Sequence, residues 1–190
     1  MTDYILWLDK IGMADLDRVG GKNASLGEMY NTLRASGIRV PQGFATTAKA
    51  YWDFLAHNQI QAKLTTLMSS INTTSFSNLE EVGKEARSLI LNSVLPEQLA
   101  KEVTKAYHNL VGQNGGHSVA VRSSATAEDL PSASFAGQHD SFLNISGDET
   151  LLSTCKKCFA SLFNDRAIKY RKNNCFEHMQ VDLSLGVQQM

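Results

Sequence analysis

The stretch SVAVRSSATAEDLPSASFAGQHDSFLNIS, residues 118–146, decides how this chain should fold. The apolar run that ends at Arg122 and the run DSFLNI both have the β-branched and aromatic content that is typical of strands. Between them lies a segment composed mainly of Ser, Ala, Thr and Gly, whose small side chains let a backbone approach a ligand closely. The stretch therefore predicts two strands joined by a segment suited to binding.

Outward from this stretch, apolar periods of helical and strand type alternate along the chain, with Gly and Pro between them. We expect extended segments at 5–8, 38–47, 118–121, 140–145 and 181–190. We expect helices at 19–36, 48–58, 77–93, 96–114, 148–163 and 163–174, and make no assignment for 61–78. The mixture predicts an α/β (mixed α+β) fold.

Three helical predictions are specific enough to test. One face of the first helix should be buried, and it consists of Leu26, Met29, Tyr30 and Leu33. Asp148 should cap the helix that follows it, because its carboxylate can accept from free backbone N–H groups. The charged run Tyr170–Lys172 should form a solvated helix face.

The composition excludes several functional classes. The chain has 190 residues, 43% of them hydrophobic, which suffices for one domain with a substantial core. The formal net charge is -1, so we expect no nucleic-acid binding driven by overall charge. No apolar run is long enough for a membrane span, and the N-terminus lacks the pattern of a signal peptide. We expect a cytoplasmic protein.

The cysteines indicate packing rather than metal chemistry. Cys155 and Cys158 form a CxxC pair inside a predicted amphipathic helix, and Cys175 is the third thiol. A structural zinc site needs four ligands, and no fourth is evident. We therefore favour buried structural cysteines and expect no metal site in this chain.

The motif VGGKNAS, residues 19–25, is a first candidate for anion binding. Two glycines precede Lys22 at a predicted helix start, where backbone amides, the helix dipole and the lysine charge all favour an anion. It is not a Walker loop, because Asp15 and Asn23 stand where that pattern needs Gly and Ser or Thr. From the motif alone, a helix-start turn with a solvated lysine is the simpler interpretation.

Arg122, at the end of its strand, is a second candidate. Its planar guanidinium suits phosphate oxygens. Hydroxyl donors follow it, namely Ser123, Ser124, Thr126 and Ser134. The alternative is a surface loop in which the arginine pairs with Glu128 or Asp129, and the residues alone leave both interpretations open.

Two further features concern the end of the sequence and the segment after Arg122. Gln188 or Gln189 on the last strand could face a cleft and contact a base, whereas His139 is more simply explained as a solvated side chain. The sequence stops on a predicted strand, which suggests a piece of a longer protein.

Four quoted segments carry a family resemblance: VGGKNASLGEM, VPQGFATTA, VAVRSSATAEDLPSASFAGQHDSFLNI and ASLFNDRAIKYR. They resemble the N-terminal part of the phosphoenolpyruvate synthases (pyruvate, water dikinases), which are related to pyruvate phosphate dikinase and rifampicin phosphotransferase. The resemblance implies that residues 1–190 are the N-terminal lobe of an ATP-grasp nucleotide-binding domain. The phosphohistidine domain and the pyruvate-binding TIM barrel would lie outside this chain.

The resemblance also implies an activity. In this family ATP, pyruvate and water give AMP, phosphoenolpyruvate and phosphate through a phosphohistidine, with Mg²⁺ required. The ligands of Mg²⁺ would lie beyond residue 190, pyruvate would be bound by the absent domains, and the full-length protein could be a homodimer. This chain alone should not catalyse the reaction, and it should bind ATP weakly or not at all.

By position, the resemblance assigns roles to five residues. Lys22 would contact the ATP phosphates, and Arg122 would stabilise charge on the transferring group as a catalytic residue. Gly137 and Ser141 would lie over the phosphates, and Gln188 would contact the nucleotide near its base. Two alternatives remain at this point: a fragment of an antibiotic phosphotransferase similar to rifampicin phosphotransferase, and a non-catalytic nucleotide-binding module.

Overall fold

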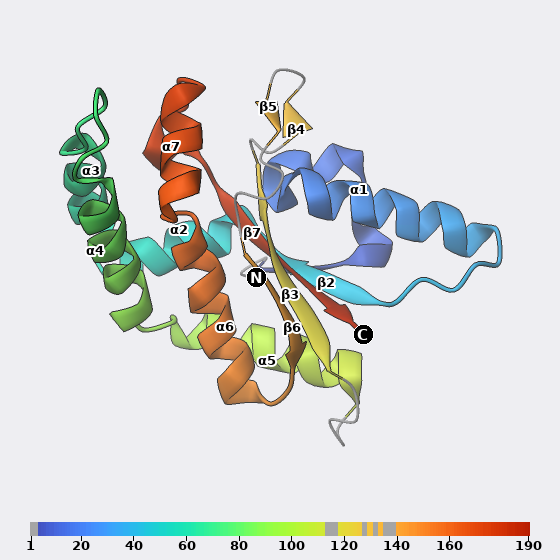
Figure 1. Ribbon diagram of the computed structural model, residues 1–190. Helices are drawn as coiled ribbons and strands as arrows, with labels where there is room; N and C mark the ends of the chain where they lie inside the picture. Colours follow the sequence, from blue (N-terminus) through green and yellow to red (C-terminus); the bar gives the residue numbers. More distant parts are fainter. Residues whose placement is uncertain (1–3, 113–117, 127–128, 131–132, 135–139) are drawn as a thin grey trace.

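The computed structural model describes residues 4–112, 118–126, 129–130, 133–134 and 140–190 (Figure 1). Its centre is a five-stranded sheet in the order β1-β2-β7-β3-β6, and every pair of neighbours is antiparallel. The strands of this sheet are β1 (Ile5–Trp7), β2 (Gly43–Thr46), β3 (Val119–Ala125), β6 (Ser141–Ile145) and β7 (Leu183–Gln189). The strand pair β4 (Asp129–Leu130) and β5 (Ala133–Ser134) forms a separate ribbon.

Helices cover both faces of the sheet. They are α1 (Leu16–Ala35), α2 (Ala48–His57), α3 (Gln61–Ser69), α4 (Leu79–Asn92), α5 (Glu97–Val111), α6 (Asp148–Ser161) and α7 (Asp165–Asn173). Short 3-10 turns are η1 (Leu8–Lys10), η2 (Met13–Asp15) and η3 (His178–Gln180). The mixed α/β class predicted from the sequence is confirmed. The segment left unassigned contains α3, which buries Leu64 and Met68 one helical turn apart.

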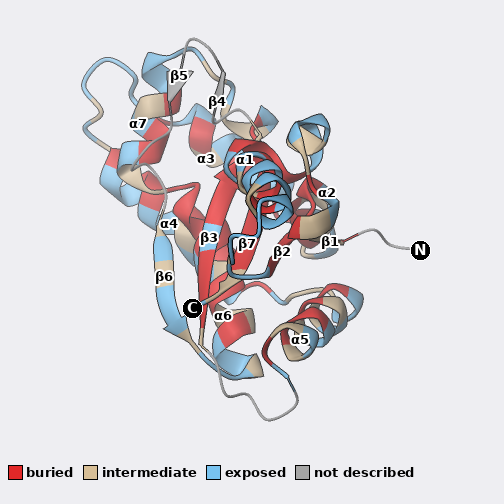
Figure 2. Cartoon of the chain, turned by 90° about the vertical axis from the view of Figure 1, so that its right-hand side faces the viewer, coloured by how far each residue is buried: buried red, intermediate tan, exposed pale blue. Residues whose placement is uncertain are grey.

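The sheet separates two unequal layers. Helix α1 lies on one side of β3 and β7, whereas α2, α5 and α6 pack on the other side (Figure 1). Strands β3 and β7 are buried along most of their length, while β6 lies exposed at the sheet edge (Figure 2). The central strands therefore present one set of side chains to α1 and the alternate set to the larger helical layer.

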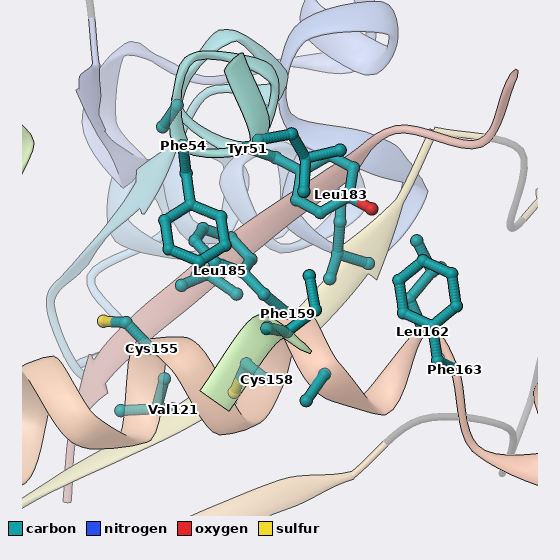
Figure 3. Close-up of a cluster of buried hydrophobic side chains, with 14 of the residues drawn as sticks. Tyr51, Phe54, Val121, Cys155, Cys158, Phe159, Leu162, Phe163, Leu183 and Leu185 are labelled. Carbon is teal, nitrogen blue, oxygen red and sulfur yellow. The ribbon is translucent and has the colours of Figure 1, made fainter. Parts of the chain in front are cut away.

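The larger layer contains the main hydrophobic core. Leu183, Leu185 and Val187 of β7 are buried there with aromatic side chains from α2 and α6 (Figure 3). The ring centroids of Phe54 and Phe159 lie 5.2 Å apart, which is within the range of favourable aromatic contacts. The core therefore packs α2 and α6 together on the same face of the sheet.

Cys155 and Cys158 belong to the same core. Both are free and buried in the face of α6 that packs on the sheet (Figure 3). Burial raises the pKa of the Cys155 thiol to about 12, and it raises the pKa of Cys158 as well. Both sulfurs are therefore thiols at neutral pH, as a packing role requires.

The predicted buried face of α1 is wrong in part. Tyr30 is buried, but Met29 is 46% exposed, and the helix instead buries Asn23, Ala24 and Gly27. The reason is close packing: a Cβ at Gly27 would lie 2.6 Å from the carbonyl oxygen of Ile11. Helix α1 approaches its neighbours through small residues, which turns its larger apolar side chains outward.

The predicted cap of α6 is also wrong. The N-cap residue is Gly147, in a left-handed conformation with φ 83°, and Asp148 is the first helical residue. The Asp148 carboxylate lies 3.0 Å from Nε2 of His108 on α5. The carboxylate thus links two helices instead of capping one.

The charged run at the end of α7 is not entirely solvated. Arg171 is fully buried, while its neighbour Lys172 is exposed as expected. The Nε of Arg171 donates to Nδ1 of His178 at 3.1 Å, and the two terminal nitrogens of Arg171 have no hydrogen-bond partner among the described residues. A single buried arginine cannot be recognised from an otherwise polar helical run.

Candidate functional site

The fold brings three of the predicted binding residues into one cleft between α1 and the sheet. Lys22 comes from α1, Arg122 from β3 and Gln188 from β7, although these positions are far apart in sequence. The cleft has a volume of about 370 Å³, which is within the size range of small-ligand sites. Its lining residues are Lys22, Asn23, Ser25, Leu26, Met29, Arg122, Ser123, Gly186 and Gln188.

Lys22 is positioned by a break in α1. Gly20 has φ 75° and ψ 162°, so the regular helix starts after it and Lys22 lies in its first turn. A Cβ at Gly20 would lie 2.4 Å from Oγ of Ser124 on β3. The first glycine of the motif therefore allows the chain to approach the sheet closely at this point.

Arg122 is exposed, although the rest of β3 is buried between β7 and the edge strand β6. Its Cα pairs with Gly186 of β7 on one side and with Ser141 of β6 on the other. Gly186 has no side chain, and the Asn23 side chain of α1 occupies the space over it, next to the arginine. A guanidinium on a rigid strand is a precise donor for phosphate oxygens.

Two of the hydroxyl donors predicted beside Arg122 are buried. Ser124 is buried, and its Oγ accepts a hydrogen bond from the backbone N–H of Asn23 at 3.3 Å. Ser123 is also buried, and its Oγ has no hydrogen-bond partner among the described residues. The side chains of Ser134, Glu128 and Asp129 lie outside the described part of the structure, so the proposed ion pair with Arg122 stays untested.

Gln188 is the glutamine that reaches this cleft, and Gln189 lines a different one beside Trp7. The Nε2 of Gln188 donates to the carbonyl oxygen of Pro41 at 3.2 Å. A carbonyl can only accept, so this contact fixes the orientation of the amide. It leaves the amide oxygen of Gln188 as an acceptor for a ligand group.

Three other residues considered in the sequence analysis cannot be placed in the cleft. Ser141 is exposed at the start of β6, beside Arg122 in register, but it is not among the lining residues. Gly137 and His139 lie outside the described residues. Their roles remain predictions.

The charge of the cleft suits an anion. Its described lining contains the cations Lys22 and Arg122 and no carboxylate. Within the described ranges, no group of three or more His, Cys, Asp or Glu side chains could hold a metal ion. The cleft therefore fits the phosphates of a ligand.

Two apolar residues line the cleft that the sequence analysis did not predict as cleft residues. Leu26 and Met29 extend from Lys22 along α1 and give the cleft an apolar wall. Their helical spacing predicted core packing, and no signal in the sequence separates the two roles. Gly186 was also missed, although a glycine inside a strand often marks a close approach.

One negative finding concerns membranes. Among the described residues, none of the helices has the length and apolar character needed to cross a bilayer.

The comparisons with known proteins agree with this geometry. Residues 16–190 match the family model described as pyruvate phosphate dikinase, AMP/ATP-binding domain. The chain is 51% identical over 190 residues to the phosphoenolpyruvate synthase of Neisseria meningitidis serogroup B, covering 99% of this chain and 24% of the relative. It is 48% identical over 195 residues to that of Synechocystis sp. and 46% identical over 190 residues to that of Pseudomonas aeruginosa, covering 100% of this chain and 24% of each relative. The chain thus spans about a quarter of the length of these curated relatives.

Proposed function

The chain belongs to the pyruvate phosphate dikinase AMP/ATP-binding domain family, and on this premise we propose that it is the ATP-binding part of a phosphoenolpyruvate synthase. The observation that carries the proposal is the shared cleft of Lys22, Arg122 and Gln188. Two cations and an amide in one cleft match a nucleotide, which has charged phosphates and a polar base. The names of the similar relatives support the same activity.

The whole reaction would need the remaining three quarters of the relatives' length. ATP would transfer its β-phosphate, with the γ-phosphate attached, to a histidine, and AMP would leave. Water would then release phosphate, and the remaining phosphoryl group would pass to pyruvate to form phosphoenolpyruvate. In this proposal the histidine and the pyruvate site belong to those other segments.

Within the chain, Lys22 would contact the phosphates and Arg122 would stabilise the charge that develops on the transferring group. Gly137 and Ser141 would lie near the phosphates, and Gln188 would face the base. Mg²⁺ would shield phosphate charge when bound. Because the described cleft lining contains no carboxylate, its ligands would come from other segments of an ATP-grasp domain.

The setting of the enzyme is also part of the proposal. Three free cysteines fit a reducing cytoplasm, where a gluconeogenic enzyme of this kind would act. A homodimer would form through segments other than this chain. No observation favours the antibiotic phosphotransferase over the synthase, since the relatives named above are all synthases.

The decisive experiment joins residues 1–190 to the remaining segments of the Neisseria meningitidis relative and measures phosphoenolpyruvate formation from ATP and pyruvate. We expect activity, and we expect it to be lost in Lys22→Ala and Arg122→Ala. An inactive hybrid beside an active parent enzyme would refute the assignment. Phosphorylation of rifampicin but not of pyruvate would favour the antibiotic phosphotransferase.

The isolated chain gives a second measurement. Calorimetric titration with Mg-ATP should show weak binding or none, because the chain forms only one wall of the site. Saturable binding that disappears in both variants would mean that the phosphate-binding wall is preformed. Phosphoenolpyruvate formation by the isolated chain would contradict the need for further segments.

A further inference from the structure

A buried amide lies next to Lys22 at the start of α1. Asn23 is only 4% exposed, and its Nδ2 donates to the carbonyl oxygen of Val19 at 3.1 Å and to Oγ of Ser184 at 2.9 Å. The carbonyl of Val19 can only accept, so the nitrogen of the side-chain amide must point toward it. Both amide hydrogens of Asn23 are therefore used within the protein.

The hydrogen bonds of Asn23 continue into three strands. The Ser184 hydroxyl on β7 donates a hydrogen bond to the carbonyl oxygen of Thr46 on β2, at 2.5 Å. The Thr46 hydroxyl in turn accepts from the backbone N–H of Leu185 at 3.0 Å. Together with the bond from the Asn23 backbone to Ser124 on β3, this network ties the first turn of α1 to β2, β3 and β7.

The side chain of Asn23 also has a matched space on the sheet. A Cβ on Gly186 would lie 2.3 Å from Oδ1 of Asn23, which no real pair of atoms tolerates. Gly186 is the β7 partner of Arg122 in register. The Asn23 side chain thus fills the space over Gly186, which lies beside Arg122 in the sheet. Asn23 also directly follows Lys22 in the sequence.

The geometry points to Asn23 as a positioning residue: it holds the first turn of α1 against β7 and so sets where Lys22 stands relative to Arg122. The functional half of this inference rests on the proposed ATP site. The helix dipole, the first-turn amides and the lysine all move with this turn, so a loosened turn displaces the phosphate-binding groups together.

Helix α1 provides a matched comparison. Asn31 also donates its side-chain amide to backbone carbonyls, to Ile11 at 3.2 Å and Leu8 at 3.5 Å. It lies two turns further along the helix and is not among the residues that line the cleft. Asn31 therefore anchors the same helix without fixing Lys22.

The first test uses the 190-residue chain without ligand. We compare amide hydrogen exchange in Asn23→Ala, Asn31→Ala and the unchanged chain. We expect exchange of the amides at 22–26 to rise at least tenfold in Asn23→Ala, with the strands β3 and β7 still protected. Asn31→Ala should leave this turn unchanged. Equal protection of the turn in all three proteins would overturn the anchoring role.

The second test uses the hybrid enzyme described above. Asn23→Ala should raise the KM for ATP at least tenfold and lower kcat, with the KM for pyruvate within twofold of its original value. Asn23→Asp, which keeps the shape but loses the two donors, should show the same loss. Ser184→Ala, which removes one acceptor, should show a smaller one.

The outcomes separate the inference from the proposed function. An inactive unsubstituted hybrid would count against the proposed function alone, and the exchange experiment would still decide the anchoring role. A KM for ATP that changes equally in Asn23→Ala and Asn31→Ala would overturn the positioning role, because general helix docking would then explain both. If Asn23→Ala does not fold, Ser184→Ala and Asn23→Asp carry the same comparison.

Discussion

The two faces of β7 differ in what they contain. Toward α1 the strand presents Ser184, Gly186 and Gln188. Ser184 accepts a hydrogen bond from Asn23, Gly186 leaves space for the Asn23 side chain, and Gln188 lines the cleft. Toward α2 and α6 the alternate residues Leu183, Leu185 and Val187 are buried in the apolar core. One strand of seven residues thus builds a site and a core at once.

This difference shows how stability and binding are separated in the fold. The core face stabilises the folded state through burial of apolar side chains, and a cavity there lowers the free energy of unfolding. The site face consists of small and polar residues, whose burial contributes little free energy of folding. These residues allow α1 to approach the sheet, and the two cations Lys22 and Arg122 line the cleft between them. Substitutions on the two faces should therefore change different measured quantities.

The largest expected effect is on the site face. In the hybrid enzyme, Arg122→Ala should lower turnover by about 100-fold or more, the typical loss when one contact to transition-state charge is removed. Because Arg122 is exposed, the melting temperature should hardly change. Arg39→Ala, at another exposed arginine, is the control. Near-normal turnover of Arg122→Ala would exclude the catalytic role.

Gly20 tests the contact that brings α1 to the sheet. Gly20→Ala adds a side chain at positive φ and places it 2.4 Å from Oγ of Ser124, so we expect a loss of roughly 3 kcal/mol in the free energy of unfolding. Gly37→Ala, also at positive φ but with nothing within 4 Å, should lose only about 1 kcal/mol. Equal losses in chemical denaturation would show that strain alone matters.

Leu185 tests the core face at the position next to Gly186. Leu185→Ala should lower the free energy of unfolding by about 3 kcal/mol, because the residue is fully buried and a cavity would remain. In the hybrid enzyme the KM for ATP should stay within twofold at temperatures where the variant is folded. A large rise in this KM would mean that the two faces are not separable.

Much of this division could be predicted from the sequence. The alternation in VDLSLGVQQM and the apolar run before Arg122 indicated strands, and Lys22, Arg122 and Gln188 were recognised as cleft residues from motif and resemblance. Cationic residues in a local motif can be recognised from the sequence because phosphate binding favours positive charge. The assignment of helices at 48–58 and 77–93 succeeded for a similar reason, since each has a clear apolar period.

The contacts between distant segments could not be predicted. Asn23 was noted only because it departs from a Walker loop, yet its partners Ser184 and Thr46 lie in other strands. Ser123 and Ser124 were only candidate ligand donors in the sequence, because their roles depend on the face of the sheet toward which each side chain points. Met29 was placed in the core because helical spacing does not show which face packs most closely.

The smallest expected effect concerns a polar pair on the core side of the sheet. Burial, together with the positive charges of Arg171 and Lys172, lowers the pKa of His178 to about 4. The unfolded chain takes up the proton below about pH 6.5, whereas the folded chain does so only near pH 4. The free energy of unfolding contributed by this group is therefore complete above pH 6.5 and is lost as the pH falls toward 4.

We expect this loss to be roughly 2 kcal/mol, because each unit of pKa shift is worth about 1.4 kcal/mol and partial exposure reduces the total. His178→Asn should flatten the decline in stability between pH 6.5 and 4, measured by urea denaturation at several pH values. His57→Asn, at an exposed histidine, should leave the decline unchanged. An unaltered decline in His178→Asn would assign the acid sensitivity to carboxylates such as Asp53. Desolvation by burial raises the pKa of Asp53, but the hydrogen bonds that Lys49 and Tyr4 donate to its carboxylate outweigh this effect and lower the pKa in the folded chain.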